Sequence, residues 1–248
     1  MALTLRVRSG QVMGRDHLLR GANCQDGKAL VEARGYFAAV LCDGCSEGER
    51  SEVGARAAAE FAAAHVGRLL ANGTAVQAVP RLLYPAIINF LREFVLAVKP
   101  ANAAQFVLDA LLFTVLGVAV RGDEAILFAA GDGTLVMDGQ IFQRDENNTP
   151  RYIGYHLLDA TTRGNLIMPE TFAVYEPEPT WERLAIATDG FEVDLFPQVW
   201  NIPHPHGLQR RMNVWWSQEM RFRDDATLVT VERVAASGNE TRTMEALK

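Results

Sequence analysis

The order of helical and strand-like segments is the feature that most constrains the fold of this chain. Two helical patterns follow one another over residues 51–71 and 74–98, and short apolar runs joined by turns fill much of the remaining sequence. Helices and strands in separate blocks are typical of α+β proteins, in which helices cover largely antiparallel sheets. Since 248 residues suit one large core, we expect a single α+β domain over residues 1–248.

The two helical segments carry local signals for their boundaries. Ser51 is expected to cap the first helix, because a serine hydroxyl can accept a hydrogen bond from the first turn, and the alanines after it favour helix. The second segment opens at Thr74 and repeats leucine, isoleucine and phenylalanine at helical spacing. Pro80 and Pro85 predict a break or kink in it, since proline cannot donate a backbone hydrogen bond inside a helix.

Short apolar runs predict the strands, and Asp-Gly or Gly-Asp pairs between them predict hairpins. The runs cover residues 36–42, 111–121, 124–130, 134–137, 140–143, 183–188 and 226–233. A further helix is expected at residues 207–220, whereas the polar segment 145–182 is not assigned. The tail from Ala235 onward is expected to fray.

Charge and composition exclude several classes of protein. A net charge of −6 gives no long-range attraction to nucleic acid, so we expect no nucleic-acid partner. The most apolar stretch, residues 111–120, is half a membrane span, so we expect no membrane association. An odd count of three cysteines, together with an N-terminus that lacks an apolar signal core, predicts a cytoplasmic location.

Aspartates stand where several of these apolar strands begin or end. Asp43, Asp132 and Asp189 each come directly after a strand, and Asp224-Asp225 comes just before one. Carboxylates that converge at low dielectric repel one another, and a divalent cation such as Mg²⁺ or Mn²⁺ neutralises such a cluster. Asp-Gly is also a common turn dipeptide, so the alternative is a set of ordinary turns in a non-catalytic interaction domain.

Five short motifs in a fixed order resemble the metal-dependent 2C-type (PPM family) serine/threonine protein phosphatases, and their bacterial branch most of all. The resemblance extends from Gly14 to Val231, nearly the whole chain. It implies a four-layer α-β-β-α sandwich, with two mainly antiparallel sheets flanked by helices and a metal centre at one end. The motifs are Asn23-Cys-Gln-Asp26, Asp43-Gly-Cys-Ser-Glu-Gly48, Gly131-Asp-Gly133, Ala187-Thr-Asp-Gly190 and Asp224-Asp-Ala-Thr227.

The same resemblance implies a role for each metal-binding position. Asp43 would bridge two Mg²⁺ or Mn²⁺ ions, and Gly44 would offer its backbone carbonyl. Asp189 and Asp224 would hold the second ion. Asp109 has the spacing of a weaker aspartate ligand for a third ion in the family.

Other matched positions concern water and phosphate. Gln25 and Asp26 match residues that hydrogen-bond metal-bound water, although the family usually has glutamate where Gln25 stands. The arginine expected before the first motif has no match at its own position, and Arg20 or His17 nearby could hold phosphate. Cys45 stands where many members have a histidine proposed as a general acid.

The resemblance implies a phosphatase that hydrolyses phosphoserine and phosphothreonine in a protein substrate of a serine/threonine kinase. Two ions roughly 3.5–4 Å apart can share one water and lower its pKa, and the resulting metal-bound hydroxide would attack phosphorus in line. The alternative is a catalytically degenerate member that binds a phosphoprotein or partner without turnover.

Overall fold

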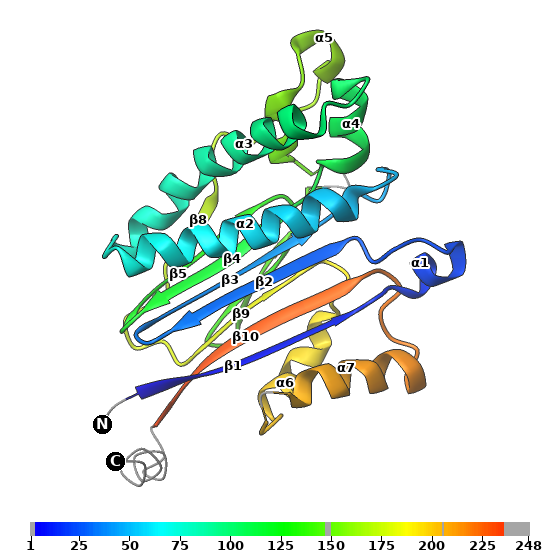
Figure 1. The fold of residues 1–248 in the computed structure, drawn as a ribbon. Coiled ribbons are helices and arrows are strands. Elements are labelled where there is room, and N and C mark those ends of the chain that lie inside the picture. Colours follow the sequence, from blue (N-terminus) through cyan, green and yellow to red (C-terminus); the bar gives the residue numbers. More distant parts are fainter. Residues whose placement is uncertain (1–2, 147–149, 205, 236–248) are drawn as a thin grey trace, which may run out of the picture.

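The computed structural model describes residues 3–146, 150–204 and 206–235. Two five-stranded antiparallel sheets pack face to face, and helices cover both outer faces (Figure 1). The expected α+β class and four-layer arrangement are therefore confirmed. Within the described ranges, no helix is both long enough and apolar enough to cross a bilayer.

Each sheet contains strands from distant parts of the chain. In the first, which we call sheet A, the order is β1 (Leu3–Val12), β10 (Ala226–Ala235), β9 (Arg183–Ala187), β6 (Gly133–Met137) and β7 (Gln140–Arg144). In the second, sheet B, it is β2 (Asp26–Ala33), β3 (Tyr36–Asp43), β4 (Val115–Arg121), β5 (Glu124–Ala130) and β8 (Ala173–Tyr175).

Strand β3 shows how the layers are held together. Its side chains alternate between two cores, as the twofold repeat of a strand requires. Phe37 and Leu41 face the core between the sheets, whereas Val40 and Cys42 face the core under the helices. All four are fully buried, and burying a side chain the size of phenylalanine or leucine stabilises the fold by about 1.5–3 kcal/mol.

Helices α2 (Ser51–Ala71), α3 (Val79–Val98) and α4 (Ala103–Ala110) cover sheet B. The predicted bounds of α2 are confirmed, but the prediction that Ser51 caps it is wrong. Ser51 is the first helical residue, and its buried hydroxyl, which has no hydrogen-bond partner among the described residues, packs beside Gly44. Ser51 itself is buried, although Arg50 before it and Val53 after it are exposed.

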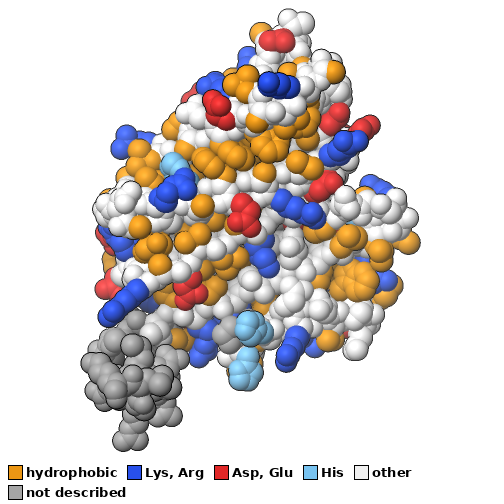
Figure 2. All heavy atoms as spheres, in the orientation of Figure 1, with side chains coloured by type: hydrophobic (Ala, Val, Ile, Leu, Met, Phe, Trp, Pro, Cys, Tyr) orange, Lys and Arg blue, Asp and Glu red, His pale blue; other side chains and the backbone are white. Residues whose placement is uncertain are grey.

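The second predicted helix is divided, as its prolines suggest. A short 3₁₀ helix, η1 (Val76–Ala78), precedes α3. Pro80 lies in the first turn of α3, where no backbone donor is required, and Pro85 lies inside the helix without ending it. Figure 2 shows hydrophobic side chains gathered over α2 and α3; the half-buried rings of Phe61 and Phe90 stack there at 4.3 Å.

Helix α7 (Gly207–Gln218), close to its predicted range, packs on β1 beside α6 (Phe196–Trp200) and covers sheet A (Figure 1).

The prediction of a strand from residue 111 is wrong at its start, since β4 begins at Val115. Residues 111–113 are apolar because they are buried in the connection after α4, and burial alone does not distinguish a strand from a connection.

The remaining elements are short. They are α1 (Arg15–Arg20), η2 (Ile153–Leu157), α5 (Ala160–Arg163) and η3 (Val193–Leu195). None of them was predicted, and η2 and α5 fall in the segment that was not assigned. The frayed tail expected beyond Ala235 lies outside the described residues.

Candidate metal centre

A cavity of about 450 Å³ opens at the end of the two sheets where β3 and β9 finish. Asp43, Asp132, Asp189 and Asp224 all line it, although they are far apart in the sequence. The structure therefore brings the three predicted metal ligands, Asp43, Asp189 and Asp224, to one place.

The strands determine this convergence. Asp43 is the last residue of β3, and the antiparallel register pairs it with Asp26 at the start of β2. Asp189 lies just beyond the end of β9, and the backbone of Thr188 donates to the carbonyl of Thr227 at the start of β10. The end of one strand and the start of its neighbour meet, so their flanking aspartates meet as well.

The carboxylates of the cavity lie in surroundings that disfavour their charged form. Burial, followed by the charges of Asp26 and Asp189, raises the pKa of Asp43 well above its ordinary value. Burial also raises the pKa of Asp26 to about 7, and it raises the pKa of Asp224. Such shifts indicate that ionised carboxylates are destabilised here unless a cation is present.

Asp26 lies behind the cavity and is almost fully buried. Its Oδ2 accepts hydrogen bonds from the hydroxyls of Thr188 and Thr227, at 3.0 and 2.5 Å. Its Oδ1 is buried and has no hydrogen-bond partner within the described part of the chain. An unpartnered buried carboxylate oxygen is costly, and a metal ion or a water on that ion would satisfy it, so the residues present fit a divalent cation.

Gln25 lines the cavity next to Asp26. Its Nε2 donates to the carbonyls of Cys45 and Gly48, at 3.5 and 3.4 Å. Its Oε1 is buried and finds no donor among the residues that the structure describes. Gln25 therefore leaves one buried acceptor unsatisfied beside the cavity.

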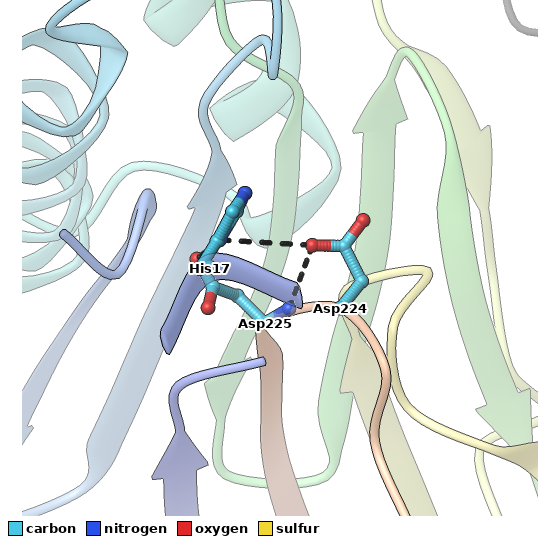
Figure 3. Close-up of side chains that lie close together, drawn as sticks. All are labelled: His17, Asp224 and Asp225. Atoms are coloured by element: carbon cyan, nitrogen blue, oxygen red, sulfur yellow. Dashed lines mark hydrogen bonds and ion pairs between the residues drawn. The ribbon is translucent and has the colours of Figure 1, made fainter. Parts of the chain in front are cut away.

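Asp225 fixes the segments that surround the metal centre. Its carboxylate accepts hydrogen bonds from the backbone N–H groups of Gly14 (2.6 Å) and Gln25 (2.5 Å), and it lies 2.8 Å from Nδ1 of His17. Figure 3 shows His17, Asp224 and Asp225 together; their ligand atoms lie within 4.8 Å of one another, a spacing that could also suit a metal ion. The sequence pattern did not indicate a role for Asp225.

The other predicted site residues differ in their placement. Gly44 and Asp109 line the cavity, and Oδ1 of Asp109 accepts a hydrogen bond from Gln105 at 2.8 Å. His17 is buried against Asp225 and does not line the cavity. Arg20 is exposed in the last turn of α1 and does not line it either.

Asp132 is a cavity residue that was not predicted as a ligand. Its Oδ1 accepts a hydrogen bond from the backbone of Glu146, at 2.7 Å, and burial raises its pKa. The Gly131-Asp132-Gly133 motif was the available signal, but a glycine-flanked aspartate is also typical of a plain turn. The opposite wall of the cavity, with Tyr152 and Tyr155, comes from the unassigned segment.

Comparison with known proteins shows the family of this chain and its fold. The family model described as protein phosphatase 2C matches residues 13–227. A bacterial serine phosphatase structure covers 94% of this chain and 100% of its own, with 12% identity and a TM-score of 0.63. PppA, a regulatory component of T6SS in Pseudomonas aeruginosa, covers 93% and 98%, with 16% identity and a TM-score of 0.58.

A serine/threonine phosphatase from S. agalactiae has 15% identity and a TM-score of 0.57, covering 92% of this chain and 99% of its own. At such identities the structures show a shared fold alone, and no curated protein matches the sequence. The family model, however, extends over most of the chain and includes all five motifs. The chain belongs to the protein phosphatase 2C family.

Proposed function

We propose that this protein is a Mg²⁺- or Mn²⁺-dependent phosphatase that hydrolyses phosphoserine and phosphothreonine in proteins. The observation that carries the proposal is the convergence of Asp43, Asp189 and Asp224 in one cavity, with the pKa of Asp43 and of Asp224 raised. Phosphatases of this family type use Mg²⁺ or Mn²⁺, which prefer carboxylate and carbonyl oxygens.

Two ions would be held by Asp43, the carbonyl of Gly44, Asp189 and Asp224. Asp109 or Asp132, which line the same cavity, would contribute to a third. When bound, the ions would supply positive charge for the phosphoryl oxygens and lower the pKa of a water molecule.

The residues of the chain would orient the reactants. Asp26 is held by two threonine hydroxyls and keeps Oδ1 free, so it can accept a hydrogen bond from the attacking water. Gln25 offers a second acceptor. Arg20 is exposed on α1, which adjoins Asp224 through His17, and we propose that it contacts the phosphate of the bound protein.

The test is hydrolysis of p-nitrophenyl phosphate and of a phosphothreonine peptide in Mn²⁺, with and without EDTA. We expect hydrolysis in Mn²⁺, its loss in EDTA, and roughly a thousandfold loss or more in Asp43→Asn, because an amide is a poor substitute for a charged ligand. Asp123→Asn, at an exposed hairpin away from the cavity, is the matched control and should retain activity.

Wild-type activity in Asp43→Asn would contradict the metal centre. If the wild-type protein binds the phosphopeptide in Mn²⁺ but hydrolyses neither substrate, the chain is a non-catalytic member of its family.

A further inference from the structure

The cavity is larger than a phosphate group requires, and its two sides differ in chemistry. One side carries the proposed metal ligands. The rest of the lining includes Tyr152, Tyr155 and Leu166, together with the acidic side chain of Glu47, which is not a proposed metal ligand. A substrate side chain next to the phosphorylated residue would occupy this second side.

The charges of the lining are all of one sign. Six carboxylates face the cavity, and among the described residues that line it there is no lysine, arginine or histidine. Two divalent ions would balance four of these charges. The phosphate of a substrate adds negative charge again, so the occupied cavity still favours a further cation.

The local backbone brings Glu47, Asp109 and Tyr155 together. The carbonyl of Asp109 accepts the backbone N–H of Arg50, and a side chain at Gly48 would come within 2.8 Å of that carbonyl. The loop that carries Glu47 is thus packed directly on the end of α4. Tyr155 lines the same cavity as Glu47, and burial raises the pKa of Tyr155 to about 12, with smaller contributions from the charges of Cys45 and Glu47.

A separate observation shows an unused acceptor at the same loop. The amide of Gln25 is held against the carbonyls of Cys45 and Gly48, and its buried Oε1 has no donor in the described segments. Gln25 is only 7% exposed. The loop beside the cavity therefore lacks a hydrogen-bond donor for the Oε1 of Gln25.

We infer that this side of the cavity is a subsite for an arginine or lysine side chain adjacent to the phosphorylated residue of the substrate. The inference rests on the proposed function. The aliphatic stem of such a side chain would pack on Leu166 and the ring of Tyr155, and its cationic head would meet Glu47. Arginine suits this better than lysine, because its planar group stacks on rings and donates several hydrogen bonds.

The test uses non-hydrolysable phosphonate analogues of phosphothreonine peptides that carry Arg, Ala, Leu or Glu next to the phosphonate. Their binding to the Mn²⁺-loaded protein is measured by fluorescence anisotropy. We expect the Arg peptide to bind about tenfold more tightly than the Ala peptide, with the difference shrinking as salt is raised. Glu47→Lys should remove the preference, whereas Glu49→Lys, in the same loop but outside the cavity lining, should retain it.

Equal binding of the four peptides, or a preference for Leu or Glu, would overturn the subsite. The same conclusion would apply if Glu47→Lys, with its fold verified by circular dichroism, kept the wild-type preference. Failure of the proposed function is a separate result: the Arg preference would persist in binding while p-nitrophenyl phosphate stayed unhydrolysed in Mn²⁺.

Discussion

Two groups of carboxylates lie near opposite ends of β10, and they differ in whether basic side chains neutralise their charge. At one end Glu232 accepts hydrogen bonds from three arginines, Arg6, Arg8 and Arg183, at 3.1–3.2 Å. At the other end Asp224 shares a cavity with Asp43 and other acids, and no basic residue in the described lining faces them.

The protein therefore neutralises one group with its own side chains, whereas the other has no basic partner in the described lining. Arg8 and Glu232 are both buried, and such a pair contributes to stability only while both partners are present. The cavity acids destabilise the metal-free fold instead. The same chemical group thus stabilises the structure at one end and, in the proposed function, binds metal at the other.

The largest loss in the free energy of unfolding is expected from Glu232→Gln. Removing this charge leaves Arg8 buried without a counter-ion, and breaking such a pair costs about 3–5 kcal/mol. Urea denaturation of the metal-free protein measures the change. A loss below about 1 kcal/mol would show that the two groups of carboxylates do not differ in the way described.

The second prediction concerns the pH dependence of stability, through the carboxyl group of Asp26. The pKa of Asp26 is about 7 in the folded protein and near 3.8 in an unfolded chain, so the folded state holds this proton more tightly. Its contribution to stability is present below about pH 4 and is lost as pH rises through about 7, by up to about 4 kcal/mol. In EDTA, the stability of wild type relative to Asp26→Asn should fall from about pH 4 to about pH 7; a rise would contradict the shift.

The third effect comes from Mn²⁺ itself. Binding to the folded state alone stabilises the protein by about 2.7 kcal/mol at roughly a hundredfold excess over Kd. The increase in melting temperature on addition of Mn²⁺ should be larger at about pH 8 than at about pH 5.5, because protons compete with the ion for carboxylates whose pKa is raised. Asp43→Asn should show little shift, and an equal shift in wild type and variant would place the bound ion elsewhere.

The smallest effect is expected at an exposed ion pair, between Arg221 and Asp194 at 2.5 Å. Asp194 is largely exposed, so water already solvates it and the pair contributes below about 1 kcal/mol. Asp194→Asn, measured beside Glu232→Gln, separates the effect of burial from the effect of charge. Similar losses of stability in the two variants would mean that burial does not determine how much an ion pair contributes.

Much of the fold could be predicted from local patterns. The alanine-rich α2 and the apolar strands β3, β5 and β9 have strong signals, because each buries one or both faces. Strand β1 was not predicted, although Leu5 and Val7 alternate with Arg6 and Arg8 as in a strand with one apolar face. The partner of the two arginines, Glu232, is supplied by a strand at the far end of the sequence.

The candidate site could be predicted in part. Asp43, Asp189 and Asp224 each stand at the end or start of a strand, and the resemblance of their motifs to the phosphatase family singled them out as ligands. Asp132 and Asp225 were missed as site residues. A glycine-flanked aspartate resembles a turn, and the role of Asp225 depends on backbone groups at Gly14 and Gln25 that no local pattern reveals.

The pairing of β1 with β10 has a consequence for biosynthesis. Asp43 emerges early from the ribosome, but Asp224 and the strand after it are translated much later. Until then β1 lacks its neighbour and the cavity lacks one wall. A partly made chain therefore cannot assemble the acidic pocket until β10, which lies between β1 and β9 in sheet A, has been translated.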